Sequence, residues 1–460
     1  MDTSISLDKQ PQAEAAPSAG AAPARKSRTD HHLWGTYILL VIVAVVELFS
    51  ASIQEVRDGS IFAPVVRHGM FLAGGFVLML LLQRIHYRVI FKLVPAYVVF
   101  CIGLMLAVRF FGSTVNEAQR AIRIAGVPVL PAEFMKLGAA LGMAWIMTKY
   151  RVKNSSRRDI TRKGMYMALG FLLLCSWLLF KDGLSNTIIV VCISFSMMLV
   201  GGMPWKKFGI ILLVFGLLGG VAVGLKTAVK KDVKLTPAQE RVIELNKEGS
   251  LDGRADGRGQ VWRDRISNHF RLDKHKDKFN VEHQQEQLSY IAQAHGGLKG
   301  VGIGRSRENG RLPLAFSDYI FAIIIEELGL FAGLGILLCY MWILGRSAKL
   351  ALRFNQTLPG VLVMGCAFVI TFQALYHMAI VSGVFPVSGQ PLPLISKGGI
   401  SVIVTSLAFG VMLSCARHAV RTTDGQVRKR QEAESLPEDM RAVNPALRTD
   451  VEQDKSTADS

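Results

Sequence analysis

Charged residues are scarce in this chain of 460 residues, where Asp, Glu, Lys and Arg together make up only 19%. Soluble domains carry roughly 25%. The low charge, the 50% of apolar residues and a mean hydropathy of +0.33 therefore exclude an ordinary soluble protein. Cysteine is scarce too. All six cysteines lie in apolar segments, so we expect no disulfides, and their spacing suggests no metal site.

Acidic residues are few relative to basic ones, 35 against 53, which leaves a net charge of +18. Such an excess can indicate nucleic-acid binding, but the chain has no DNA-reading motif and no basic patch interleaved with aromatic residues. Membrane topology explains most of the excess. The remainder lies in 226–311, where it suits anionic headgroups or an anionic lipid substrate.

Ten apolar runs are long enough to cross about 30 Å of hydrocarbon as helices. They lie near 34–52, 66–84, 90–110, 130–148, 164–181, 184–202, 208–228, 317–344, 360–382 and 399–416. Only a short polar break separates the fifth run from the sixth, so nine spans is the alternative count. The sequence predicts an all-α polytopic integral membrane protein.

Lysine and arginine are concentrated in every second loop between these runs, most densely at 149–163. Because short cytoplasmic loops are enriched in these residues, we expect both termini to be cytoplasmic and the long segment 229–316 to be exported. No cleavable signal precedes the first span, which looks like an uncleaved anchor. We expect a transmembrane domain at 34–417 between disordered tails, 1–33 and 418–460.

A lone aspartate, Asp318, stands where the polar exported segment becomes apolar, in the sequence LPLAFSDYIFAIIIEELG at 312–329. An unpaired carboxylate at a membrane face costs roughly 2.5–3.5 kcal/mol on insertion scales, so it indicates a functional position. Upstream, Gln285 and Ser289 have helical spacing and precede a glycine cluster at 296–304. Glycine lets a backbone approach a ligand closely, but this cluster lacks the setting of a dinucleotide site.

Four blocks resemble the SEDS family of membrane proteins, the shape, elongation, division and sporulation group, over about 34–417. The blocks are NEAQRAIRIAGVPVLPAEFMKLG at 116–138, KDGLSNTI at 181–188, the segment 285–329, and SGVFPVSGQPLPLISKGGIS at 382–401. Four residues depart from the family pattern: Ala121 replaces a tryptophan, Gly183 an aspartate, Leu314 a glutamate and Lys397 a tyrosine. Because of Gly183, no family role passes to Asp182.

The resemblance implies a peptidoglycan glycosyltransferase that polymerises lipid II on the outer face of the cytoplasmic membrane, and it aligns Asp318 with the essential aspartate of the family. Asp318 would be the general base for the acceptor hydroxyl, which contributes roughly 10²- to 10⁴-fold. Arg120 and Lys136 would stabilise the departing pyrophosphate. The alternative is a divalent cation, Mg²⁺ or Mn²⁺, although no ligand spacing favours one.

Other residues of the matched blocks are candidates for supporting roles. For substrate binding they are Glu133, Gln285, Ser289, Ser396 and Lys397, and for structural support they are Glu326, Glu327, Pro391, Pro393, Gly398 and Gly399. Structural alternatives exist for the main candidates. Asp318 could cap its helix for about 1 kcal/mol, Glu133 and Lys136 could be only an ion pair, and Arg120 could reach lipid headgroups. His377 fits a hydrogen-bonded packing residue better than a proton relay.

Lipid II transport is the rival function, because transporters also carry intramembrane charges and broken helices, although no internal repeat is apparent. A non-catalytic division scaffold is the third hypothesis. The long N-terminus, the extended tail and the NEAQR turn resemble division members of the family more than elongation members, which implies a septal location. The implied partners are undecaprenyl pyrophosphate, a class B penicillin-binding transpeptidase and division regulators.

Overall fold

The computed structural model describes residues 29–55, 62–111, 113–115, 118–124, 127–152, 159–180, 182–231, 284–312, 314–354 and 357–419. The predicted disordered tails fall almost entirely outside the described residues, as does 232–283 of the predicted exported segment.

Helices dominate the described part of the chain, as the sequence predicts. They are α1 (His31–Glu55), α2 (Phe62–Arg84), α3 (Tyr87–Phe111), α4 (Pro131–Lys149), α5 (Arg162–Phe180), α6 (Leu184–Val200), α7 (Trp205–Lys231), α10 (Gln284–Gly296), α11 (Ala315–Asp318), α12 (Ile320–Leu328), α13 (Leu330–Arg353), α14 (Thr357–Val381) and α15 (Gly399–His418). Among the described residues, seven helices are long and apolar enough to cross a membrane: α1, α2, α3, α5, α13, α14 and α15. Helix α6 is apolar but shorter.

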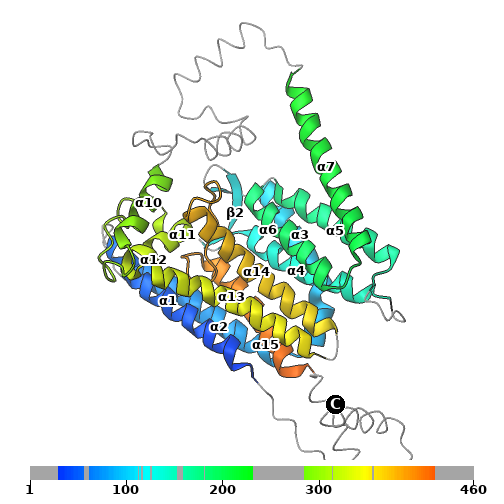
Figure 1. Cartoon of the computed structure of the whole chain (residues 1–460), viewed down its shortest axis with the longest axis horizontal. Helices are drawn as coiled ribbons and strands as arrows, with labels where there is room; N and C mark the ends of the chain where they lie inside the picture. Colours follow the sequence, from blue (N-terminus) through cyan, green and yellow to red (C-terminus); the bar gives the residue numbers. More distant parts are fainter. Residues whose placement is uncertain are drawn as a thin grey trace, which may run out of the picture.

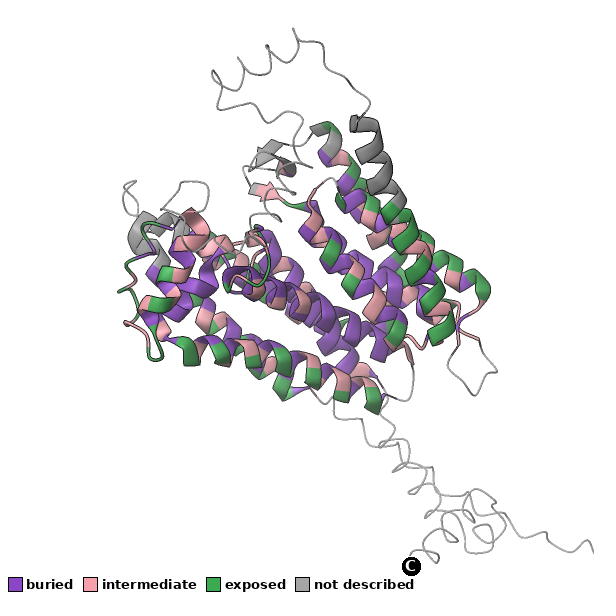
Figure 2. Ribbon diagram, turned by 45° about the horizontal axis from the view of Figure 1, so that its top comes forward, coloured by how far each residue is buried: buried purple, intermediate pink, exposed green. Residues whose placement is uncertain are grey.

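Helix α14 lies at the centre of the bundle, between α13 and α15 on one side and α4 and α6 on the other (Figure 1). Of its membrane-length residues, 83% are buried, against 22% in α3. Both helices are apolar all round, which is expected either inside a protein core or against lipid. The central helix α14 is therefore mostly buried, whereas a peripheral helix such as α3 has many exposed residues. Figure 2 shows buried residues in purple and exposed residues in green.

Helices α2 and α15 pack closely and run in the same direction. A Cβ atom on Gly75 would lie 2.6 Å from the Ser406 hydroxyl, and one on Gly410 would lie 3.2 Å from the backbone oxygen of Met79. At the N-terminal end of the pair, a Cβ on Gly399 would lie 2.5 Å from the Phe71 ring. Small residues allow such backbone approach within membranes, and the parallel packing brings the beginnings of both helices together.

The predicted eighth span at 317–344 is wrong in its position. The apolar run is divided into α11, α12 and α13, and the spanning helix is Leu330–Arg353. Gly329 separates α12 from α13 with a φ of +89°, and a Cβ there would lie 2.4 Å from the backbone oxygen of Leu298. A continuous apolar sequence hides this turn, because hydropathy does not report backbone direction.

The segment between α3 and α4 forms a small antiparallel sheet, which the all-helical prediction does not include. Its strands are β1 (Ser113–Val115), β2 (Ala118–Ile124) and β3 (Val127–Val129), in the order β1-β2-β3. In the register, Ile122 faces Val129 and Ile124 faces Val127. The sheet leads directly into Pro131, the first residue of α4, where proline is favoured because that N–H has no helical acceptor.

Candidate active site

A cavity of about 670 Å³ lies at the end of the bundle where α2, α4, α6 and α15 begin. Its wall includes residues from the early turns of all four helices, such as His68, Glu133, Asn186 and Ser401. Helix N-termini carry partial positive charge and N–H groups without helical acceptors. The cavity is therefore suited to a ligand that is both polar and anionic.

The connection 382–398, which joins α14 to α15, forms one side of the cavity and bonds to several elements around it. The Ser396 hydroxyl donates to the backbone oxygen of Ser317 at 2.8 Å, and the Lys397 N–H donates to that of Phe316 at 2.9 Å. Two proline carbonyls are also used: Pro391 O accepts from Gln373 at 3.1 Å, and Pro393 O accepts from the Tyr340 hydroxyl at 2.6 Å. These bonds fix the connection against α11, α13 and α14.

Asp318 lies against this connection at the end of α11, with its side chain half-buried. A Cβ atom on Gly389 would lie only 2.8 Å from Asp318 Oδ2, and Gly389 lines the cavity. Glycine at this position is what allows the carboxylate to approach the connection so closely. The N-cap residue of the following helix, α12, is Tyr319 and not Asp318, so the geometry does not favour the helix-cap alternative.

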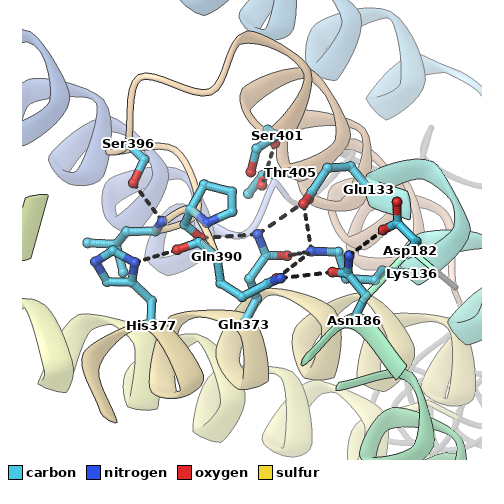
Figure 3. A network of polar contacts seen from close by, with 12 residues as sticks. Glu133, Lys136, Asp182, Asn186, Gln373, His377, Gln390, Ser396, Ser401 and Thr405 are labelled. Carbon is cyan, nitrogen blue, oxygen red and sulfur yellow. Dashed lines mark hydrogen bonds and ion pairs between the residues drawn. The ribbon is translucent and has the colours of Figure 1, made fainter. Parts of the chain in front are cut away.

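Lys136 is fully buried in α4 and its ammonium group has three acceptors (Figure 3). They are Glu133 Oε1 at 2.7 Å, Gln373 Oε1 at 2.9 Å and Gln390 Oε1 at 3.3 Å. An ammonium group has three N–H donors, and all three are used here. The Glu133–Lys136 ion pair of the sequence-based alternative is therefore present, and Glu133 but not Lys136 lines the cavity.

A chain of side-chain hydrogen bonds continues from Lys136 along the cavity wall. Gln390 Nε2 donates to Asn186 Oδ1 at 3.0 Å, and Asn186 Nδ2 donates to Asp182 Oδ2 at 2.7 Å (Figure 3). His377 is buried behind this chain, and its Nδ1 donates to the backbone oxygen of Gln390 at 2.6 Å. These amide and carboxylate groups provide a wall that can accept and donate hydrogen bonds to hydroxyl-rich ligands.

Basic side chains from two elements line the same cavity. Arg67 and His68 come from α2, and Lys397 comes from the residues just before α15. His68 is only 3% exposed, and Lys397 lies near it. Neither Arg67 nor His68 is among the site residues that the sequence predicts. A polar pair at the beginning of an apolar span was the signal that could have identified them.

Glu326 and Glu327 are buried at the end of α12, where they bind the glycine-rich segment 296–312. The Glu326 carboxylate accepts from the Arg307 N–H at 3.0 Å, from His295 Nδ1 at 2.8 Å and from the Ser306 hydroxyl. Glu327 Oε2 accepts from the Gly304 N–H at 3.1 Å. A Cβ on Gly300, whose φ is +81°, would lie 2.3 Å from the Glu327 carbonyl oxygen. These glycines pack against α12, which explains the cluster without a ligand.

The remaining sequence-predicted candidates fall into two groups, outside the cavity and on its wall. Ser289 is buried in α10, where its hydroxyl donates to Val381 O at 3.1 Å. Neither Ser289 nor Gln285 lines the cavity. Arg120 lies on β2. Gly398 and Gly399 do line the cavity. Among the described residues, no group of three His, Cys, Asp or Glu side chains is arranged to hold a metal ion.

A family model described as a cell cycle protein, which groups FtsW, RodA and SpoVE, matches residues 30–252 and 258–421. A probable peptidoglycan glycosyltransferase FtsW from Alcanivorax borkumensis is 27% identical over 399 residues, which cover 84% of this chain and 92% of the relative. The peptidoglycan glycosyltransferase MrdB of Escherichia coli is 26% identical and covers 84% and 94%.

The fold is also similar to a solved structure. A chain from a peptidoglycan synthase complex, in which polymerisation and crosslinking are coordinated, matches with a TM-score of 0.59 and 24% sequence identity. The match covers 85% of this chain and 98% of that chain. It supports the predicted polytopic helical fold.

Proposed function

This chain belongs to the FtsW/RodA/SpoVE family of cell cycle proteins, and from this premise we propose that it is a peptidoglycan glycosyltransferase that polymerises lipid II. The observation that carries the proposal is the position of Asp318, whose carboxylate contacts the cavity-lining Gly389. A carboxylate beside a polar cavity at the end of a membrane bundle can accept a proton when two lipid-linked sugars react there.

In this reaction the 4-hydroxyl of the acceptor sugar attacks the anomeric carbon of the donor, and undecaprenyl pyrophosphate departs. Asp318 accepts the hydroxyl proton as the new glycosidic bond forms, because a neutral sugar hydroxyl is a poor nucleophile. Glu133, Asn186 and Gln390 line the cavity with hydrogen-bonding groups that suit sugar hydroxyls. Lys136 is a positioning residue, since its three donors are used to hold Glu133, Gln373 and Gln390.

The cellular role that we propose is septal wall synthesis in the cytoplasmic membrane, with both termini in the cytoplasm. A class B penicillin-binding transpeptidase would crosslink the new strands, and division regulators would control the pair. Support comes from the similarity to FtsW and to a chain of a peptidoglycan synthase complex. Since MrdB is comparably similar, imaging a tagged copy at midcell or along the lateral wall decides between septal and elongation roles.

The test of the activity is glycan synthesis by the purified full chain in detergent, with lipid II, in the presence and absence of the transpeptidase. We expect glycan ladders from the wild type and a loss of roughly 10²- to 10⁴-fold in Asp318→Asn. Asp159→Asn is the matched control, because Asp159 pairs with Lys207 and does not line the cavity. Protein in detergent has no two compartments to transport lipid II between, so glycan ladders cannot arise from transport. A wild type that makes no glycan with its transpeptidase contradicts the proposal.

A further inference from the structure

The beginning of α15 combines several features that recognise an anion. Val402 donates the first helical bond, to Gly398 O at 3.0 Å, so the N–H groups of Gly399, Ile400 and Ser401 precede the helical ladder. Such groups and the helix dipole together bind phosphate readily. All three residues line the cavity.

Ser401 supplies an independent indication of a ligand. Its side chain is only 4% exposed, and its hydroxyl has no hydrogen-bond partner among the described residues. A buried hydroxyl without a partner costs about 1–3 kcal/mol when nothing compensates it. Because Ser401 also lines the cavity in the first turn of α15, a ligand bound there would provide the missing partner.

Two cationic side chains and a histidine lie near this helix start. Lys397 immediately precedes it, and the parallel packing of α2 against α15 brings Arg67 and His68 to the same cavity. The acidic groups around the cavity come from other elements. They are Asp318 from α11, beside Gly389, Glu133 from α4, where it is paired with Lys136, and Asp182 from the turn before α6, where it accepts from Asn186. An anion therefore finds its most favourable position on the α2 and α15 side.

The surface next to this basic group is apolar. Val66 and Met70 flank Arg67 on α2 and are 55% and 64% exposed. Helix α2 is one of the helices that can cross a membrane, so these side chains face lipid. A ligand that carries a diphosphate on a long hydrocarbon chain matches both surfaces, whereas free phosphate or a nucleotide uses only the basic one.

From these contacts we propose that the diphosphate of a polyprenyl-diphosphate-linked sugar binds at the start of α15. The N–H groups of Gly399 to Ser401 and the Ser401 hydroxyl donate to its oxygens, and Arg67, His68 and Lys397 surround it. This inference rests on the proposed glycosyltransferase function, for which it identifies where the leaving group is held. It assigns that role to α2 and α15 instead of Lys136, whose donors are occupied.

The test measures binding of undecaprenyl pyrophosphate to the purified full chain in detergent. Undecaprenyl monophosphate and phosphatidylglycerol are the comparison ligands, since they share the lipid character but lack the diphosphate. We expect the pyrophosphate to bind most tightly, and Ser401→Ala and Lys397→Met each to weaken it roughly 10-fold, as expected for lost bonds to a charged group. Ser194→Ala is the matched control, because its hydroxyl is also buried without a partner in the described structure but lies outside the cavity.

Two outcomes overturn the inference: wild-type affinity in both Ser401→Ala and Lys397→Met, or equal binding of phosphatidylglycerol and undecaprenyl pyrophosphate. Either of these binding results can occur while the wild type still makes glycan. In that case the proposed location of the diphosphate is refuted and the proposed function is not. Failure of the proposed function has a different signature, because a wild type that binds undecaprenyl pyrophosphate but never polymerises lipid II retains the binding site and loses the reaction.

Discussion

The Lys136 ammonium lies 3.3 Å from the side-chain oxygen of Gln390, although 254 residues separate the two in the chain. This contact ties α4, deep in the bundle, to the connection 382–398 that carries Gly389 beside Asp318. A buried cation that does not itself line the cavity thereby holds residues of the cavity wall in place.

We predict that Lys136→Met destabilises the protein by about 3–5 kcal/mol, because it leaves the Glu133 carboxylate buried and without its charge partner. The combined change with Glu133→Gln should recover most of this loss. Thermal unfolding of the two single variants and the double variant in detergent measures the coupling. Lys92→Met, at an exposed lysine, is the control, and an equal effect of both lysine changes would refute the prediction.

We predict that Gly389→Ala impairs catalysis while preserving the fold. The new methyl group would lie 2.8 Å from Asp318 Oδ2 and would displace the carboxylate. A displacement of about 1 Å in a catalytic group can reduce the rate roughly 100-fold. Polymerisation assays of Gly389→Ala and of Gly103→Ala, where a Cβ meets nothing within 4 Å, make the comparison. Full activity in Gly389→Ala would show that the carboxylate does not need its present position.

We predict that Asp30→Asn lowers stability at neutral pH but not in acid. Burial alone would raise the pKa of Asp30, but the Arg346 guanidinium, whose Nη2 lies 2.8 Å from Oδ2, and the Leu33 N–H hold that pKa below its usual value. A lowered pKa contributes stability above the unfolded-state pKa of about 3.9, and this contribution disappears as pH falls through the folded-state pKa. Unfolding temperatures of both proteins should therefore converge below about pH 4. A gap that does not narrow as the pH falls below about 4 would argue against the ion pair as its cause.

We predict that Glu47→Met stabilises the protein. Glu47 in α1 is 1% exposed, and both of its carboxylate oxygens lack a partner among the described residues. An apolar side chain of similar length removes a cost of about 1–3 kcal/mol. Glu327→Met should have the opposite effect, since Glu327 accepts bonds from Ser50 and from the Gly304 N–H. Thermal unfolding compares the two, and a destabilised Glu47→Met would mean that the carboxyl has a partner.

The sequence predicted the helical membrane fold because long apolar runs have few alternatives in lipid, and this prediction was confirmed. It failed where an apolar run changes direction, as at Gly329, because hydropathy carries no information about backbone angles. The role of Asp318 stays a prediction. The bonds among Lys136, Gln373 and Gln390 could not be predicted, since each residue lies in a different segment and only the packing of α4 against α14 brings them together.

Glu47 shows the opposite limitation. A carboxylate inside an apolar run was visible in the sequence, but the family motifs lie in other segments and give this residue no role. Only its complete burial separates it from an acidic residue that reaches the surface.

Because α2 and α15 pack closely, positions far along the pair can affect the end of the bundle that holds the cavity. Gly410 lies more than two turns below Ser401, yet any side chain there would push against Met79 and Leu82 and lever the whole of α15 away from α2. Random mutagenesis should therefore recover inactive proteins from this glycine as readily as from the cavity wall.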